Sequence, residues 1–269
     1  TTSESVESMD LEATNTNEII KTHQMIQIPT SDLAESRPLF HSVSSLIFDL
    51  NEMLYFEVHP LLSESAPEDL RDLLKDKCSQ CLQVCDFTND DETFKKKKEN
   101  EKSQILTDIL NCVSDPNKVQ ILSEHEYQQI YHMFRRNVIR TPPPPPDVWF
   151  APVSIDFTLD RIEERGWSHL SLFYDIITAF ISNRKFNPSF CPEEQKKLLK
   201  GVISMFQSPD AREREKDVKL FHAIYRANKK IRTACRDQVS TFLSAAIYSP
   251  TPRLGVADML TAFVPIIAG

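Results

Sequence analysis

Apolar residues recur every three or four positions along most of the chain, which is the spacing of one face of an α-helix. The first such stripe is Leu39, Val43, Leu46, Leu50 and Leu54. Later stripes fall within residues 67–85, 101–113, 123–138, 167–180, 192–206, 210–224, 232–248 and 256–267. No segment shows the strict alternation of a half-buried strand. The pattern predicts about ten helices joined by short polar turns.

Residues typical of helix N-termini precede several stripes. Ser123 is followed three positions later by Glu126, which is the spacing of a capping box. Pro209 with Asp210, and Pro67 with the acids after it, are typical of a first helical turn. These residues predict where three of the helices begin.

Three segments interrupt the helical pattern. Residues 1–30 are rich in Ser, Thr, Asn and Glu without apolar periodicity, which predicts a disordered N-terminal arm. Residues 89–98 predict a polar connection, and we interpret Lys95 to Lys98 as solvated; a nuclear-import signal or a phosphate contact is the alternative. Pro142 to Pro146 lack backbone donors and predict a stiff extended loop, either a spacer or a ligand of SH3 or WW domains.

The order of the helices indicates the architecture. Consecutive helix pairs of roughly 40 residues, without a strict sequence repeat, are typical of HEAT-type arrays. About ten helices are too many to share the single core of a bundle. We therefore expect an all-α fold, a HEAT-like helical-repeat solenoid (α-α superhelix) over residues 31–269.

Glycine is scarce, with only four among 269 residues. Neither a G-x-G-x-x-G nor a P-loop motif can be formed, which excludes glycine-cradled nucleotide sites. We expect Gly166 at the entry of the helix that begins with Trp167, where Trp167 anchors the core between repeats. Gly201 falls inside a predicted helix at a cost of about 1 kcal/mol relative to Ala, without an evident reason.

Charge and hydropathy narrow the classes of partner. The net charge is −8, which argues against a general nucleic-acid binder or a protein of anionic membrane surfaces. No apolar run approaches the length of a membrane span. We expect no nucleic-acid or membrane partner, and a cytoplasmic location with the nucleus as a second compartment.

The cysteines allow two interpretations. Cys78, Cys81 and Cys85, taken with Cys112, superficially resemble a zinc-binding set. The same residues continue helical apolar stripes, as Cys235 does, which favours free thiols in the core. No second pair of ligands completes a metal site, so we predict no metal.

Nothing in the sequence predicts an enzyme. His132 and His169 have no nucleophile or acid in a recognisable motif beside them, and we predict no catalytic residue and no cofactor. Arg212 and Arg214 alternate with Glu213 and Glu215. We interpret these four residues as ion pairs along a solvated first turn, with scaffold binding as the alternative.

Several fragments of the chain resemble one family, in register and in order from about residue 70. Residues 208–215 read SPDARERE, and residues 221–225 read FHAIY. The corresponding sequences in the family are SEDPRERD and LHRIYG. Further matches are Gln80-Cys81 with Asp86-Phe87, residues 127–142, and the segment from Trp167 to Tyr174. The chain thereby resembles the B-prime (B56-type) regulatory subunits of protein phosphatase 2A.

This resemblance implies a HEAT-like solenoid that is not itself an enzyme. Family members dock on the phosphatase scaffold and catalytic subunits and bring substrates to them. Their groove reads short linear motifs of the Leu-x-x-Ile-x-Glu type. Relative to the family, residues 31–269 are expected to be incomplete at the C-terminal end, as a truncated chain, as a shortened isoform, or with a partner covering the last helix. The alternative is a divergent α-solenoid adaptor that no longer assembles with the phosphatase.

The resemblance also implies groove residues. His222, Tyr225, Arg232 and Ile266 match the groove of the family. Ala223 stands where the family has Arg, and Ala262 stands where it has Ile. We expect the first to remove a charge from the groove and the second to hollow its apolar wall. Gly255 aligns with the Gly that opens the last helix of the groove, which should bring that helix beside His222.

Overall fold

The computed structural model describes residues 56–85, 87, 92–142, 163–249 and 253–268. The chain divides into two compact units, Thr1–Leu39 and Phe40–Gly269, and every described residue belongs to the second. The expected arm, the expected helix of residues 39–54 and the prolines 143–146 lie outside the described residues.

The described part of the second unit is helical and contains no strand. Its elements, in order, are α1 (Leu70–Gln80), α2 (Glu92–Ser114), α3 (Pro116–Val119), α4 (Glu124–Val138), α5 (Trp167–Ser182), α6 (Pro192–Met205), α7 (Ala211–Ala227), the short 3₁₀ helix η5 (Lys229–Ile231), α8 (Arg232–Ile247) and α9 (Val256–Ala268). None of the helices in these ranges is long and apolar enough to cross a lipid bilayer.

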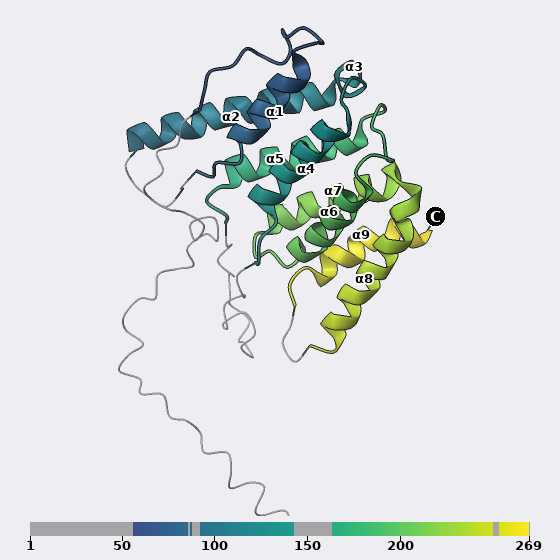
Figure 1. Ribbon diagram of the computed structural model, residues 1–269. Helices are drawn as coiled ribbons and strands as arrows, with labels where there is room; N and C mark the ends of the chain where they lie inside the picture. The colour runs from purple at the N-terminus through teal and green to yellow at the C-terminus, as the bar shows by residue number, and fades with distance from the viewer. Residues whose placement is uncertain (1–55, 86, 88–91, 143–162, 250–252, 269) are drawn as a thin grey trace, which may run out of the picture. The chain divides into compact units, whose positions relative to one another are not determined.

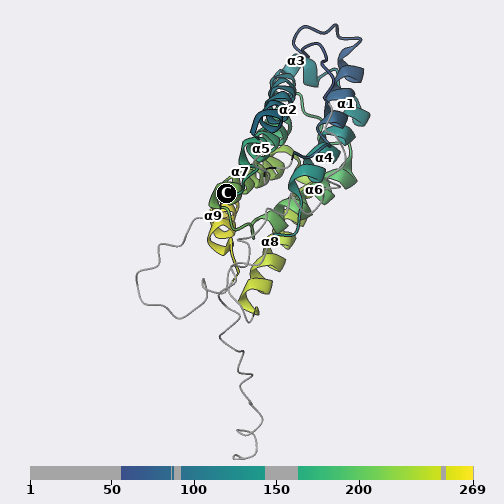
Figure 2. The ribbon, with the colours of Figure 1, turned by 90° about the vertical axis from the view of Figure 1, so that its left-hand side faces the viewer.

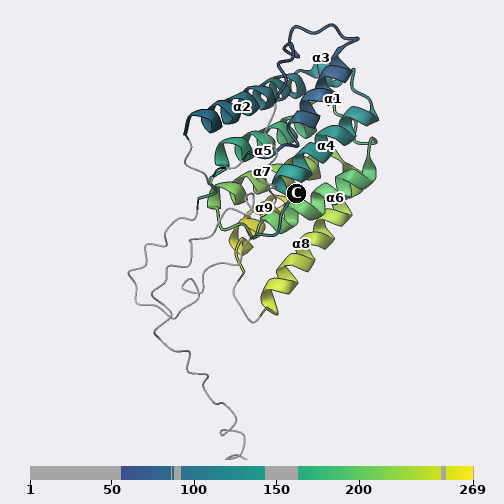
Figure 3. The same cartoon turned by 60° about the vertical axis from the view of Figure 1, so that its left-hand side comes forward.

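The longer helices form two stacked layers (Figures 1 and 2). Helices α2, α5, α7 and α9 pack in succession in one layer, and α1, α4, α6 and α8 in the other. Each repeat pairs one helix from each layer, as in α4 with α5 and α6 with α7. Figure 3 shows the same succession from a third direction. This order of packing is that of a helical-repeat solenoid, as expected from the sequence.

Aromatic side chains fill the space between the layers. Tyr127 packs against Phe180, with ring centroids 4.6 Å apart, and also against Phe186 and Phe190. Farther along the stack, Phe206 meets Phe221 with ring centroids 6.4 Å apart. Aromatic contacts of this kind, edge-on for most of these pairs and stacked for Tyr127 with Phe186, add to the free energy gained by burial. The core is therefore continuous along the stack, rather than being gathered at one centre.

None of the six cysteines, all of which lie among the described residues, forms a disulfide, and all six are buried. Burial raises the pKa of Cys81 to about 12, and does the same for Cys112 and Cys235. The thiolate, which is the form that binds metal, is therefore disfavoured. Within the described ranges, no three His, Cys, Asp or Glu side chains gather where they could hold a metal ion. The thiols pack as small apolar groups, as the stripes indicated.

Two predicted helix ends are wrong. Helix α1 ends at Gln80, so Cys81 is its C-cap and Cys85 lies beyond it. Helix α2 begins at Glu92, so Lys95 to Lys98 lie within a helix and not in a polar connection. Lysine is a good helix former, and a solvated turn of helix needs no apolar stripe. The caps of α4 and α7 are confirmed, with the Ser123 amide donating to Glu126 Oε2 over 2.7 Å.

Close packing explains two of the glycines. A Cβ on Gly201 would lie 2.7 Å from Cδ1 of Ile139, so this helix-interior glycine makes room for a side chain of the neighbouring segment. Gly255 has φ of 74°, and a Cβ there would lie 1.8 Å from the carbonyl oxygen of Phe206. The cost of Gly201 thus has a reason in tertiary packing.

Candidate functional site

A pocket of about 550 Å³ opens where the C-terminal part of α7, the start of α8 and the C-terminal part of α9 meet. It is lined by His222, Tyr225, Arg226, Arg232, Pro265 and Ile266. The four groove residues matched from the sequence are all among these. Residues that are up to 44 positions apart in the chain therefore share one concave surface.

Helix geometry and one turn assemble the pocket. His222, Tyr225 and Arg226 share a face of α7, because residues three and four apart are neighbours on a helix. Gly255 turns the chain into α9, which then packs against α7. Nε2 of His222 lies 2.8 Å from the carbonyl oxygen of Ala262. This contact fixes α9 beside α7, as the position of Gly255 led us to expect.

Tyr225 organises the basic end of the pocket. Nε of Arg232 donates to the Tyr225 carbonyl oxygen over 3.0 Å, and the Arg232 guanidinium lies 5.0 Å from the centre of the Tyr225 ring. Nη1 of Arg236 donates to the Tyr225 hydroxyl over 3.3 Å. Stacking and hydrogen bonding together hold both guanidinium groups in place before any ligand arrives.

The two alanines are not part of the lining. Ala223 is 3% exposed and Ala262 is fully buried, and both belong to the core. The expectation that these two positions weaken the groove stays a prediction, because a buried alanine still leaves the pocket without the Arg and the Ile that the resemblance implies. A small side chain at each position lets α7 and α9 pack closely.

Two lining residues were missed by the sequence analysis. Arg226 could have been found, because it follows His222 by four positions and so shares its face of the helix. Pro265 precedes Ile266 inside α9. Nothing in the local pattern marked its side chain as part of a pocket.

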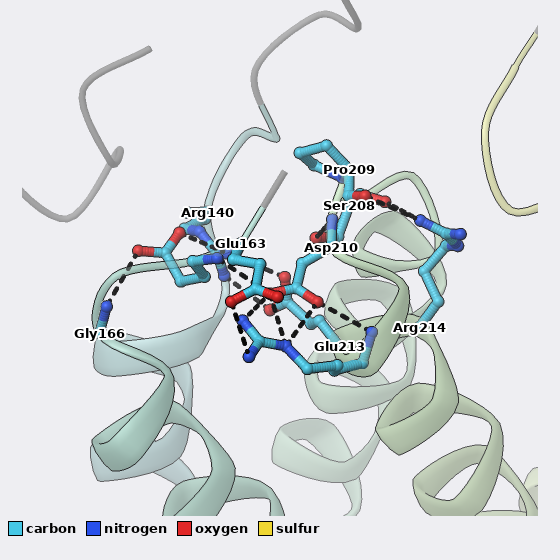
Figure 4. A network of polar contacts seen from close by, with 10 residues as sticks. Arg140, Glu163, Gly166, Ser208, Pro209, Asp210, Glu213 and Arg214 are labelled. Atoms are coloured by element: carbon cyan, nitrogen blue, oxygen red, sulfur yellow. Dashed lines mark hydrogen bonds and ion pairs between the residues drawn. The ribbon is translucent and has the colours of Figure 1, made fainter. Parts of the chain in front are cut away.

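A buried polar network ties α4, α5 and α7 together close to the start of α7 (Figure 4). Arg140, which follows α4, donates to both carboxylate oxygens of Glu213 over 2.7 and 2.8 Å, and to Glu164 over 3.3 Å. Glu213 is fully buried. Burial by itself would lower the pKa of Arg140, but Glu213 and then Glu164 raise it overall. The expectation that Glu213 lies on a solvated turn is wrong.

The neighbours of Glu213 do lie nearer to solvent. Arg212 pairs with Asp210 over 2.7 Å, and its guanidinium lies 4.7 Å from the Trp167 ring centre. Arg214 pairs with Asp258 of α9 over 2.8 Å. Trp167 is half-buried and packs against the core, and the Arg212 guanidinium lies over one face of its ring.

Asp217, one turn after Glu213, is fully buried. Neither of its carboxylate oxygens makes a hydrogen bond of good geometry within the described part of the chain. The Tyr174 hydroxyl donates to Glu213 over 3.2 Å, and it also acts on Asp217, whose pKa it lowers in part. Burial raises the pKa of Asp217 well above its usual value, and the charge of Glu213 raises it further. The protonated form of Asp217 is therefore favoured in the folded protein.

The two histidines considered for catalysis do not form a site. His132 is exposed on α4. His169 is buried in α5, with Nε2 2.9 Å from the carbonyl oxygen of Glu99. Burial, together with the charge of Lys102, lowers the pKa of His169 to about 4. A buried neutral imidazole held by a main-chain carbonyl is a structural group.

Comparison with known proteins agrees with the fold. The model of the protein phosphatase 2A regulatory B subunit (B56) family matches residues 59–269. The chain belongs to the B56 family. The match covers every helix of the described part of the chain, including the three around the pocket.

Individual proteins of the B56 family are also similar to this chain. The chain is 29% identical over 216 residues to the serine/threonine-protein phosphatase 2A 56 kDa regulatory subunit alpha isoform of Mus musculus, covering 79% of this chain and 43% of that protein. It is 30% identical over 230 residues to the beta isoform of Oryctolagus cuniculus, covering 85% and 44%. It is 27% identical to the delta isoform of Homo sapiens, covering 84% and 37%. The chain thus spans about two fifths of the length of these relatives.

Proposed function

We propose that the chain is a non-catalytic, substrate-targeting subunit of a protein phosphatase 2A holoenzyme, and that it binds the scaffold and catalytic subunits. Membership of the B56 family supports this proposal, as do relatives that are named regulatory subunits of the phosphatase. The substrates are proteins that present a short Leu-x-x-Ile-x-Glu-like motif. The observation that carries the proposal is the pocket between α7, α8 and α9.

The two ends of the pocket suit the last part of such a motif. Side chains two positions apart on an extended peptide point the same way, and lie about 7 Å from each other. The motif's Ile would then meet Pro265 and Ile266, while its Glu meets the guanidinium groups beside Tyr225. Apolar burial supplies affinity, and the charged contact fixes the register.

The proposed pocket is tested by titrating the full chain with a labelled Leu-x-x-Ile-x-Glu peptide and following fluorescence anisotropy. We expect Ile266→Asp to weaken binding at least tenfold, because it places a carboxylate in the apolar wall. The matched control is Val264→Asp, which adds the same charge at an exposed position of α9 outside the pocket. Equal binding by both variants would remove the pocket from the proposal.

The second candidate function is an α-solenoid adaptor that binds peptides without assembling with the phosphatase. The alanines at positions 223 and 262, where the resemblance implies Arg and Ile, favour this candidate. Both candidate functions predict that the chain binds the peptide. They differ in whether the chain also assembles with the phosphatase subunits. Reconstitution with phosphatase subunits therefore separates them.

A further inference from the structure

The pocket face of α7 carries its charge at an unexpected position. In this chain Ala223 is buried, whereas Arg226 is exposed and lines the pocket. The basic side chain on this part of the pocket thus comes from the residue four positions after His222, about one turn onward.

Arg226 is available to a ligand. Its Nε donates to the carbonyl oxygen of His222 over 3.3 Å, which holds the side chain along its own helix. No carboxylate among the described residues pairs with Arg226, Arg232 or Arg236. By contrast, Arg140 and Arg214 both contact acidic partners.

The surrounding sequence strengthens the local positive charge. Residues 225–236 contain five basic side chains and no acidic one, in a chain whose net charge is −8. The basic residues are Arg226, Lys229, Lys230, Arg232 and Arg236. Arg232 and Arg236 are engaged by Tyr225 on one side. Arg226 adds a second guanidinium to the lining beside Arg232, and the hydrogen bond that it makes within the described part of the chain is to the His222 carbonyl oxygen of its own helix.

We propose that Arg226 binds the carboxylate of the docked peptide. Arg226 then determines selectivity for a peptide with an acid two residues after its apolar anchor. A guanidinium suits this task, because its terminal nitrogens can contact both oxygens of a carboxylate. The inference rests on the proposed peptide-binding function.

The test is a titration that compares the motif peptide with a matched peptide in which Gln replaces the final Glu. Wild-type chain, Arg226→Gln and Lys229→Gln are titrated with both peptides at two salt concentrations. Lys229→Gln is the matched control, because it removes one exposed positive charge three positions away, outside the lining. Circular dichroism confirms that each variant is folded.

We expect Arg226→Gln to weaken binding of the Glu peptide about threefold to tenfold, and to leave binding of the Gln peptide unchanged. Lys229→Gln should weaken both peptides by less than about twofold. If Arg226→Gln keeps the wild-type preference for Glu over Gln, the assignment of Arg226 is overturned, while peptide binding itself stands. If the wild-type chain binds neither peptide, the proposed function fails and the inference fails with it.

Discussion

Among single side chains, the charged residues inside the helix stack are the least expected feature. Glu213 and its partner Arg140 are 73 positions apart, so no local pattern connects them. A buried pair of this kind holds specific helices together, and the loss of either partner would leave an uncompensated charge. The Arg-Glu alternation of residues 212–215 looks the same whether a turn is solvated or buried.

Asp217 gives a prediction about pH. Its raised pKa means that the folded chain binds a proton that the unfolded chain releases above about pH 4. Stability therefore falls as pH rises from that point. Asp217→Asn removes the charge while keeping the shape of the side chain. We expect it to raise the free energy of unfolding by about 2 kcal/mol at pH 7.5, and by much less at pH 5.

Urea unfolding at the two pH values measures this effect. Asp237→Asn is the matched control, because Asp237 is exposed on α8 and its neutralisation should change stability by less than about 0.5 kcal/mol at either pH. A gain for Asp217→Asn that is the same at pH 5 and pH 7.5 would show that Asp217 carries no raised pKa.

The pocket residues show how far single positions could be predicted. His222, Tyr225, Arg232 and Ile266 followed from the resemblance, and the structure brings them together. Arg226 was not predicted, because the matching family fragment LHRIYG has Gly at that position. The burial of Ala223 depends on the packing of α7 against other helices, which the sequence of α7 alone does not encode.

Between helices, the turn at Gly255 determines whether the pocket forms. Its φ of 74° is in the left-handed region, and a Cβ there would overlap the Phe206 carbonyl oxygen. We expect Gly255→Ala to lower the free energy of unfolding by about 2–4 kcal/mol and to weaken peptide binding, because α9 can no longer seat against α7.

Gly166→Ala is the matched control for this prediction. Its φ is −77°, and a Cβ there would approach only the Phe87 side chain, at 3.1 Å. We expect a change in unfolding free energy of less than about 1 kcal/mol and unchanged peptide binding. Thermal unfolding and the anisotropy titration measure both. Normal binding by Gly255→Ala would mean that the turn does not position the pocket.

The existence of the helices was largely predictable from apolar periodicity, and their ends were less so. The capping box at Ser123 and the cap at Asp210 were correct, because a cap is a local chemical signal. The end of α1 was placed too late, since the apolar spacing continues to Cys85 after the backbone has left the helix. The spacing of apolar residues indicates which residues are buried, and residues in turns can be buried as well as residues in helices.

For the molecule as a whole, the two-layer stack explains how a chain without a central core can be stable. Each helix pair contacts its neighbours, so the buried surface accumulates along the stack. The pocket forms where α7, α8 and α9 meet, from residues of successive pairs. The expectation of a solenoid is confirmed, because it depended on the number and order of helices and not on any exact helix boundary.

Assembly with the phosphatase is the central claim. The direct measurement is to mix the purified full chain with phosphatase 2A scaffold and catalytic subunits, and to analyse the mixture by size-exclusion chromatography with light scattering. Our account predicts a single complex that contains one copy of each of the three proteins. A chain that is folded by circular dichroism and still elutes apart from a scaffold–catalytic dimer would contradict it.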